Sequence, residues 1–188
     1  KLDHIIPGLD KRHPTAQKLL QKIKELEHEG QVFEAAEASF ELLARRTLGT
    51  IREPFKLINY RTFNHRSTRS SAGEAIVKIE IDGTIYHTAG DGDGPVNALD
   101  AALRQGLEQV YPSLKGVHLE DYKVRVLSSA AGTAAKVRVL IETSDTKHTW
   151  STVGVSENII EASWIALVDS FTYKLMIDGL ITTENKTV

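Results

Sequence analysis

The sequence predicts an α+β fold, in which an N-terminal helical hairpin precedes two duplicated strand–strand–strand–helix units with antiparallel sheets. Near Phe55 the hydrophobic period changes from the 3.6 residues of a helix to the 2 of a strand, and one order of strand, turn and helix signals then occurs twice. A common offset of 64 residues superposes Gly90 on Gly154, Ala98 on Ala162, Ala102 on Ala166 and Leu103 on Leu167. Because one helix leaves much of a small sheet uncovered, we expect the two units to pack together.

Residues 1–52 are predicted to form a linker, over residues 1–12, and a helical subdomain. The first helix begins at Pro14 and ends near Gly30, and the second ends near Gly49. Both helices are amphipathic, with apolar faces formed by Leu19, Leu20, Ile23 and Leu26 and by Phe33, Ala36, Phe40 and Leu43. A short loop joins them, so we expect a hairpin that is free or only loosely attached to the rest of the chain.

Residues 53–188 are predicted to contain both duplicated units. The first, at about 53–112, has strands near 57–63, 75–81 and 84–89, with an Asp82-Gly83 turn, and a helix from Val96 to Val110. The second, at about 117–178, has strands near 122–127, 135–143 and 148–153 and a helix over 160–175. Gly90 and Gly154 are expected to break the strand that comes before each helix.

The composition excludes several classes of function. The net charge of −2 gives no basic surface for nucleic acid, no apolar run is long enough for a membrane span, and no signal-like segment opens the chain. The absence of cysteine excludes disulfides and thiolate chemistry and fits a reducing cytoplasm. None of the seven histidines has the spacing of a metal site, and no nucleophile motif is present. We therefore predict no catalytic and no metal-binding residue.

The segment Gly90–Pro95 is the most unusual local feature, since it carries three glycines in five residues and leads directly into a helix. The unpaired N–H groups and partial positive charge of a helix N-terminus suit a carboxylate or a phosphate. Asp91 and Asp93 would repel a phosphate dianion, and Pro95 stands where a calcium loop would need an oxygen ligand. The alternative is a plain glycine turn with Asp93 as the N-cap.

The chain closely resembles the C-terminal region of the citramalate synthase and 2-isopropylmalate synthase family over about residues 13–177. The matching segments are Val32–Leu43 (VFEAAEASFELL), Gly92–Leu103 (GDGPVNALDAAL), Asp121–Leu127 (DYKVRVL), Gly132–Val139 (GTAAKVRV) and Thr152–Trp164 (TVGVSENIIEASW). The resemblance implies an acyltransferase that condenses acetyl-CoA with pyruvate or with 3-methyl-2-oxobutanoate. It also implies a divalent metal in a TIM barrel N-terminal to these residues, so the fragment would be inactive alone.

The family's C-terminal domain forms homodimers and binds isoleucine or leucine as a feedback inhibitor. The second unit resembles the citramalate branch more closely, which favours isoleucine; a leucine-binding domain of a 2-isopropylmalate synthase and a purely structural dimerisation module stay open as alternatives. The implied cell compartment is the cytoplasm.

An amino-acid effector needs N–H donors for its carboxylate, an acceptor for its ammonium group and an apolar pocket. At the helix start, Gly92, Gly94 and Val96 can donate backbone N–H groups to the carboxylate, and Asp93 or a carbonyl of the loop can accept from the ammonium group. The resemblance implies that the effector lies between the two units. The resemblance to the family adds further pocket residues: Asn97, Leu119, Tyr122, Val126, Thr133, Ala134 and Val155. The complete predicted site comprises these residues together with Gly92, Asp93, Gly94, Pro95 and Val96. A valine at Gly94 is expected to block both close approach of the ligand and any positive φ.

Overall fold

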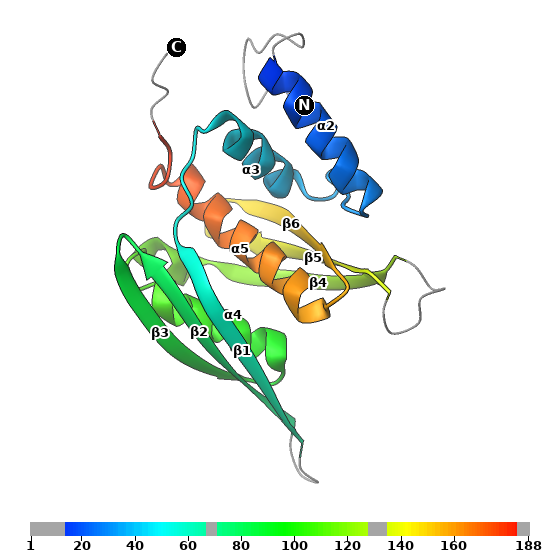
Figure 1. The fold of residues 1–188 in the computed structure, drawn as a ribbon. Coiled ribbons are helices and arrows are strands. Elements are labelled where there is room, and N and C mark those ends of the chain that lie inside the picture. Colours follow the sequence, from blue (N-terminus) through cyan, green and yellow to red (C-terminus); the bar gives the residue numbers. More distant parts are fainter. Residues whose placement is uncertain (1–13, 67–70, 128–134, 184–188) are drawn as a thin grey trace. The chain divides into compact units, whose positions relative to one another are not determined.

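A computed structural model describes residues 14–66, 71–127 and 135–183, and it confirms the α+β class (Figure 1). Four α-helices and two three-stranded sheets occur among these residues. The linker predicted at residues 1–12 lies outside them. The chain divides into two compact units: residues 53–118, called here the first unit, and the described residues of 1–52 and 119–188, called the second unit. Each unit contains one sheet covered by one helix.

The first unit contains β1 (Lys56–Arg66), β2 (Ser71–Ile81), β3 (Thr84–Gly92), α4 (Pro95–Leu107) and a short 3-10 helix (Pro112–Gly116). The strands pair antiparallel in the order β1-β2-β3, and α4 packs on this sheet. The β2–β3 turn has positive φ at Asp82 (47°) and Gly83 (82°), as a type I′ hairpin turn requires. The core between sheet and helix consists of fully buried aliphatic side chains, among them Val77, Ile79, Leu99, Leu103 and Leu107.

The second unit repeats this arrangement with β4 (His118–Val126), β5 (Val137–Ser144), β6 (Thr149–Ser156) and α5 (Ile159–Ile177). The strand order is β4-β5-β6, and α5 packs on β5 and β6. Phe171 and Leu175 of α5 are fully buried, as is Ile141 of β5. Asn158 is the N-cap of α5, because its side chain accepts a hydrogen bond of 2.8 Å from the Ile160 N–H.

The helices α2 (Pro14–His28) and α3 (Glu37–Leu48) belong to the second unit. The expectation that this hairpin is free or loosely attached is wrong, because α3 packs against α5 and β6. The segment after α3 is also fixed to the C-terminal segment, where the Arg52 N–H donates to the Ile181 carbonyl at 2.9 Å and the Thr183 N–H donates to the Thr50 carbonyl at 2.9 Å. The division into residues 1–52 and 53–188 stays a prediction.

The 64-residue offset has a structural cause, since equivalent residues hold each helix on its sheet. Thr88 Oγ1 donates to the Ala102 carbonyl at 2.6 Å, and Thr152 Oγ1 donates to the Ala166 carbonyl at 2.8 Å. A Cβ atom added to Gly90 would lie 2.5 Å from a backbone nitrogen of α4, and one added to Gly154 would lie 2.0 Å from a carbonyl oxygen of α5. Both glycines are therefore needed so that helix backbone can lie directly against strand backbone.

The expectation that these glycines break their strands is consequently wrong. β3 continues through Gly90, which pairs with Ala75, to Gly92, which pairs with Gly73. β6 likewise continues through Gly154, paired with Val139, to Ser156. Close contact with the helix backbone, and not a turn, therefore accounts for glycine at these two positions.

Candidate functional site

The predicted glycine segment forms the junction between β3 and α4. Gly94 is the N-cap of α4 and Pro95 is its first helical residue, and no side chain caps this helix start. The first backbone N–H groups of a helix have no partner within the helix, and Pro95 has no N–H to offer. The N–H groups of Val96 and Asn97 are therefore the donors that this junction can present to an anion.

Gly94 itself has an extended backbone, with φ −165° and ψ 176°. Gly94 therefore has no positive φ that a valine would exclude, and only the effect of valine on close approach of a ligand applies. A Cβ atom at Gly94 would have no heavy atom within 4 Å, so a side chain there would enter open space in front of the helix start. Gly92 differs, because its Cβ would lie 2.5 Å from Asn97 Oδ1 and 2.6 Å from the Ala98 nitrogen.

Asp93 is exposed and precedes the N-cap, so the alternative in which Asp93 caps the helix is wrong. Its backbone N–H donates to Asn97 Oδ1 at 3.2 Å. The Asn97 side chain thereby closes the turn and holds the junction in shape. The Asp93 carboxylate has no bond to α4 and is available to accept hydrogen bonds from a cationic group beside the helix start.

The two helix starts differ at the equivalent residue. In the second unit, Asn158 occupies the N-cap position 64 residues after Gly94, and its side chain accepts from the Ile160 N–H. Val96 is the residue equivalent to Ile160, and no side chain caps the helix that it begins. The first unit thus leaves open a donor that the second unit satisfies internally.

The other predicted site residues lie in the second unit, apart from Thr133 and Ala134, which lie outside the described residues. The Tyr122 hydroxyl is 2.7 Å from Ser163 Oγ of α5, so this ring lies on the helix-covered face. Val155 follows Gly154, which faces α5, and successive side chains of a strand alternate, so Val155 points to the opposite face. Leu119 and Val126 are exposed by 40% and 56%.

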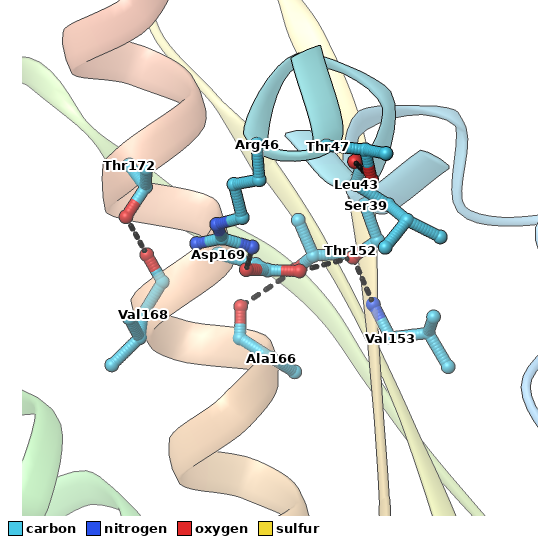
Figure 2. Close-up of polar contacts among 10 residues, drawn as sticks. All are labelled: Ser39, Leu43, Arg46, Thr47, Thr152, Val153, Ala166, Val168, Asp169 and Thr172. Carbon is cyan, nitrogen blue, oxygen red and sulfur yellow. Dashed lines mark hydrogen bonds and ion pairs between the residues drawn. The ribbon is translucent and has the colours of Figure 1, made fainter. Parts of the chain in front are cut away.

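A polar cluster that the sequence did not predict attaches α3 to α5 and β6 (Figure 2). Ser39 Oγ donates to Asp169 Oδ2 at 2.8 Å, and Arg46 Nη1 donates to Asp169 Oδ1 at 2.7 Å. Ser39 Oγ also accepts from the Val153 N–H at 3.1 Å, which covers part of the open edge of β6. Ser39 and Asp169 are buried. The sequence signal that could have indicated the cluster was an acidic residue, Asp169, in the middle of α5, a helix rich in apolar residues.

A second buried polar group ties the β5–β6 turn to the end of α5. Lys174 Nζ lies 2.7 Å from Asp145 Oδ2 and 2.7 Å from Asp178 Oδ1, and Asp145 Oδ1 accepts the N–H groups of Lys147 and His148 at 2.7 Å each. Burial opposes ionisation of Asp145, but the Lys174 hydrogen bond and the two backbone donors outweigh it and hold the pKa of this carboxyl well below its usual range.

Among the described residues, no group of three or more His, Asp or Glu side chains is placed to hold a metal ion. No helix between residues 14 and 183, in the ranges described, is long and apolar enough to cross a membrane.

These features define an internally duplicated βββα module that carries a firmly attached N-terminal helix pair. The chain belongs to the LeuA allosteric (dimerisation) domain family, whose family model matches residues 34–175. It is 54% identical over 172 residues to an (R)-citramalate synthase of Aquifex aeolicus, covering 90% of this chain and 33% of that protein. It is 51% identical over 169 residues to an (R)-citramalate synthase of Geobacter sulfurreducens, covering 89% and 32%.

A 2-isopropylmalate synthase of Clostridium kluyveri is 29% identical over 154 residues, covering 81% of this chain and 27% of the relative. The chain thus spans about a third of the length of the curated relatives it matches.

Proposed function

We propose that this chain is the feedback-regulatory and dimerising portion of an acetyl-CoA-dependent 2-oxo acid condensing enzyme of the citramalate synthase type. The main support for this proposal is the difference in sequence identity, which is 54% to an (R)-citramalate synthase and 29% to a 2-isopropylmalate synthase. The parent protein would condense acetyl-CoA with pyruvate in the cytoplasm, on the route to isoleucine. This portion would be inactive alone and would form homodimers.

The proposed ligand is isoleucine, and its carboxylate is assigned to the start of α4. The absence of a side-chain cap at Gly94 supports this assignment, because the carboxylate would accept from the N–H groups of Val96 and Asn97. The exposed Asp93 carboxylate would accept from the ammonium group. Asn97 would hold the turn through the Asp93 N–H. The remaining proposed effector residues are Gly92, Pro95, Leu119, Tyr122, Val126, Thr133, Ala134 and Val155.

The test is a calorimetric titration of the chain with isoleucine and with leucine. Both ligands carry the same charged groups, so the apolar residues must discriminate between them, by about 10- to 200-fold in affinity for one misplaced methyl group. Val126→Ala should weaken the binding of isoleucine and narrow the difference in affinity between isoleucine and leucine. Tighter binding of leucine would assign the chain to the 2-isopropylmalate branch. If neither amino acid binds, the chain serves in dimerisation only.

The helix start is tested by Gly94→Val, with Gly94→Ala as the smaller matched change. A Cβ at this position meets nothing within 4 Å, so we expect both variants to fold, as far-ultraviolet circular dichroism would verify. The two valine methyl groups should enter the space assigned to the carboxylate and abolish binding, whereas alanine should only weaken it. Binding of isoleucine to Gly94→Val with unchanged affinity would show that the assignment is wrong.

Light scattering tests the assembly. A dimer mass at micromolar protein concentration is expected, because small sheets leave edges and apolar side chains that pairing can cover. A monomer mass under these conditions would contradict the proposal.

A further inference from the structure

Two arginines stand opposite one another on neighbouring strands of the second unit. The Leu127 N–H donates to the Lys136 carbonyl at 2.9 Å, and this bond sets the β4–β5 register that places Arg125 opposite Arg138. On its other side Arg138 is paired with Val155 of β6. Arg125 is exposed and Arg138 is half-buried, so the pair lies at the surface. Like charges directly opposite each other destabilise a sheet, so this pairing needs an explanation.

The guanidinium group of Arg138 is only partly satisfied. Its Nη1 donates to the Gly30 carbonyl, at the end of α2, at 2.8 Å. Its Nε is buried and has no hydrogen-bond partner. Nε and Nη2 form the side of a guanidinium group that matches the two oxygens of a carboxylate. The bond to Gly30 thus fixes Arg138 through one nitrogen and leaves that side unused.

Other arginines of the described chain are paired with a carboxylate. Arg45 is paired with Glu41, Arg46 with Asp169 and Arg104 with Asp100. Neither Arg125 nor Arg138 has an ion pair with any described residue. Burial and then the charge of Arg125 lower the pKa of Arg138, and no carboxylate opposes them. An unmet buried donor beside two uncompensated positive charges is a costly arrangement that an anion would relieve.

We propose that the Arg125–Arg138 pair is a binding site for a carboxylate. The two carboxylate oxygens accept from Nε and Nη2 of Arg138, and Arg125 supplies the second positive charge. The fork geometry and partial burial favour a planar carboxylate over a more strongly hydrated phosphate. The carboxylate belongs either to a free small molecule or to an Asp or Glu side chain of a second copy of this chain. Both arginines lie on β4 and β5 of the second unit, and the site does not require amino-acid feedback.

The test follows the arginine Nε–H resonances of the ¹⁵N-labelled chain by NMR during titration with sodium acetate. Sodium chloride at equal ionic strength is the reference. We expect the Arg138 Nε–H signal to shift saturably with acetate. The Arg104 Nε–H signal is the internal control, because this group already donates to Asp100 at 2.9 Å and should stay in place.

Two variants separate the parts of the proposed site. Arg125→Gln keeps the Arg138–Gly30 bond and should weaken acetate binding by about tenfold, through loss of one charge. We expect acetate to raise the melting temperature of the parent chain. Arg138→Lys keeps the charge but loses the fork, and should remove this increase. Because Arg138→Lys also loses a bond to α2, its fold is checked by circular dichroism, and Arg125→Gln stands as the independent variant.

The outcomes distinguish the source of the carboxylate. A saturable acetate shift in the dilute chain supports a small-molecule ligand. An Arg138 Nε–H signal that acetate does not move, but that changes on dilution and stops doing so in Arg125→Gln, supports a carboxylate of a second copy. If neither occurs, or if chloride produces the same shift as acetate, the proposal is overturned.

Discussion

Gly154→Ala should destabilise the second unit strongly, because the added methyl group has no room. Its Cβ would lie 2.0 Å from the Ala162 carbonyl oxygen and 3.0 Å from the Ile165 Cβ. Ordinary non-bonded contacts lie near 3.5 Å, so helix and strand would have to separate by about 1 Å or more. Separation would also stretch the Thr152–Ala166 hydrogen bond of 2.8 Å, which joins the same two elements.

The magnitude follows from these two effects. Overpacking costs about 1–3 kcal/mol and the weakened hydrogen bond about 1 kcal/mol, so we expect the free energy of unfolding to fall by about 3 kcal/mol. Gly94→Ala is the matched control, because its Cβ is unobstructed and its φ of −165° suits any residue. In Gly94→Ala, alanine is a weaker N-cap than glycine, which destabilises the folded chain, but it also reduces the conformational freedom of the unfolded chain, which stabilises the fold. These two effects nearly cancel, so the free energy of unfolding should change by no more than about 0.5 kcal/mol.

Urea unfolding followed by tryptophan fluorescence is the appropriate assay, because both tryptophans, Trp150 and Trp164, are buried in the second unit. Gly154→Ala should move the fluorescence midpoint to lower urea at nearly constant slope. Gly90→Ala, the equivalent change in the first unit, should be read by circular dichroism. It should move the tryptophan signal only if the two units unfold together. A midpoint for Gly154→Ala equal to that of the parent would refute the close-packing argument.

Two further changes test the polar groups of the second unit. Ser39→Ala removes a buried bond to Asp169 and should cost about 1–3 kcal/mol in urea unfolding, whereas Thr47→Ala, which loses only a bond within α3, should cost less than about 1 kcal/mol. Equal costs would contradict a role in attaching α3. Because the folded-state pKa of Asp145 is depressed, its contribution is present above the unfolded value of about 3.9 and is lost as pH falls below it. The melting temperature of the parent chain should therefore fall between pH 5 and about 2, and it should fall less in Asp145→Asn. An equal fall in both proteins would show that the Lys174–Asp145 pair does not stabilise the fold.

The fold could be predicted because local pattern and tertiary structure agree along most of the chain. The alternation over Ala75–Ile81 matches a strand with one face buried under α4, and Asp82-Gly83 forms the turn that this dipeptide favours. The glycines misled the prediction for a physical reason. Glycine is used both where a chain turns and where two backbones touch, and only the neighbours across space distinguish these uses.

Other features depended on residues far apart in the sequence. Ser39 and Asp169 are separated by 130 residues, so no periodicity within α3 or α5 could pair them. Because the sequence did not reveal this pair, it predicted a helix hairpin that is free or only loosely attached. The cross-strand position of Arg125 against Arg138 likewise depends on the β4–β5 register.

The duplication also provides a test of the proposed effector site, because a side chain caps the start of α5 and none caps the start of α4. Gly94→Asn places at α4 the residue that caps α5, where Asn158 accepts from the Ile160 N–H at 2.8 Å. The new side chain should accept from the equivalent Val96 N–H and stabilise the first unit by a few tenths of a kcal/mol. It should also compete with a ligand carboxylate for that donor and weaken isoleucine binding by about tenfold, as expected for one charge-assisted hydrogen bond. Calorimetry on Gly94→Asn thus separates the two roles of the helix start. A variant that becomes more stable yet binds isoleucine as tightly as the parent would place the carboxylate elsewhere.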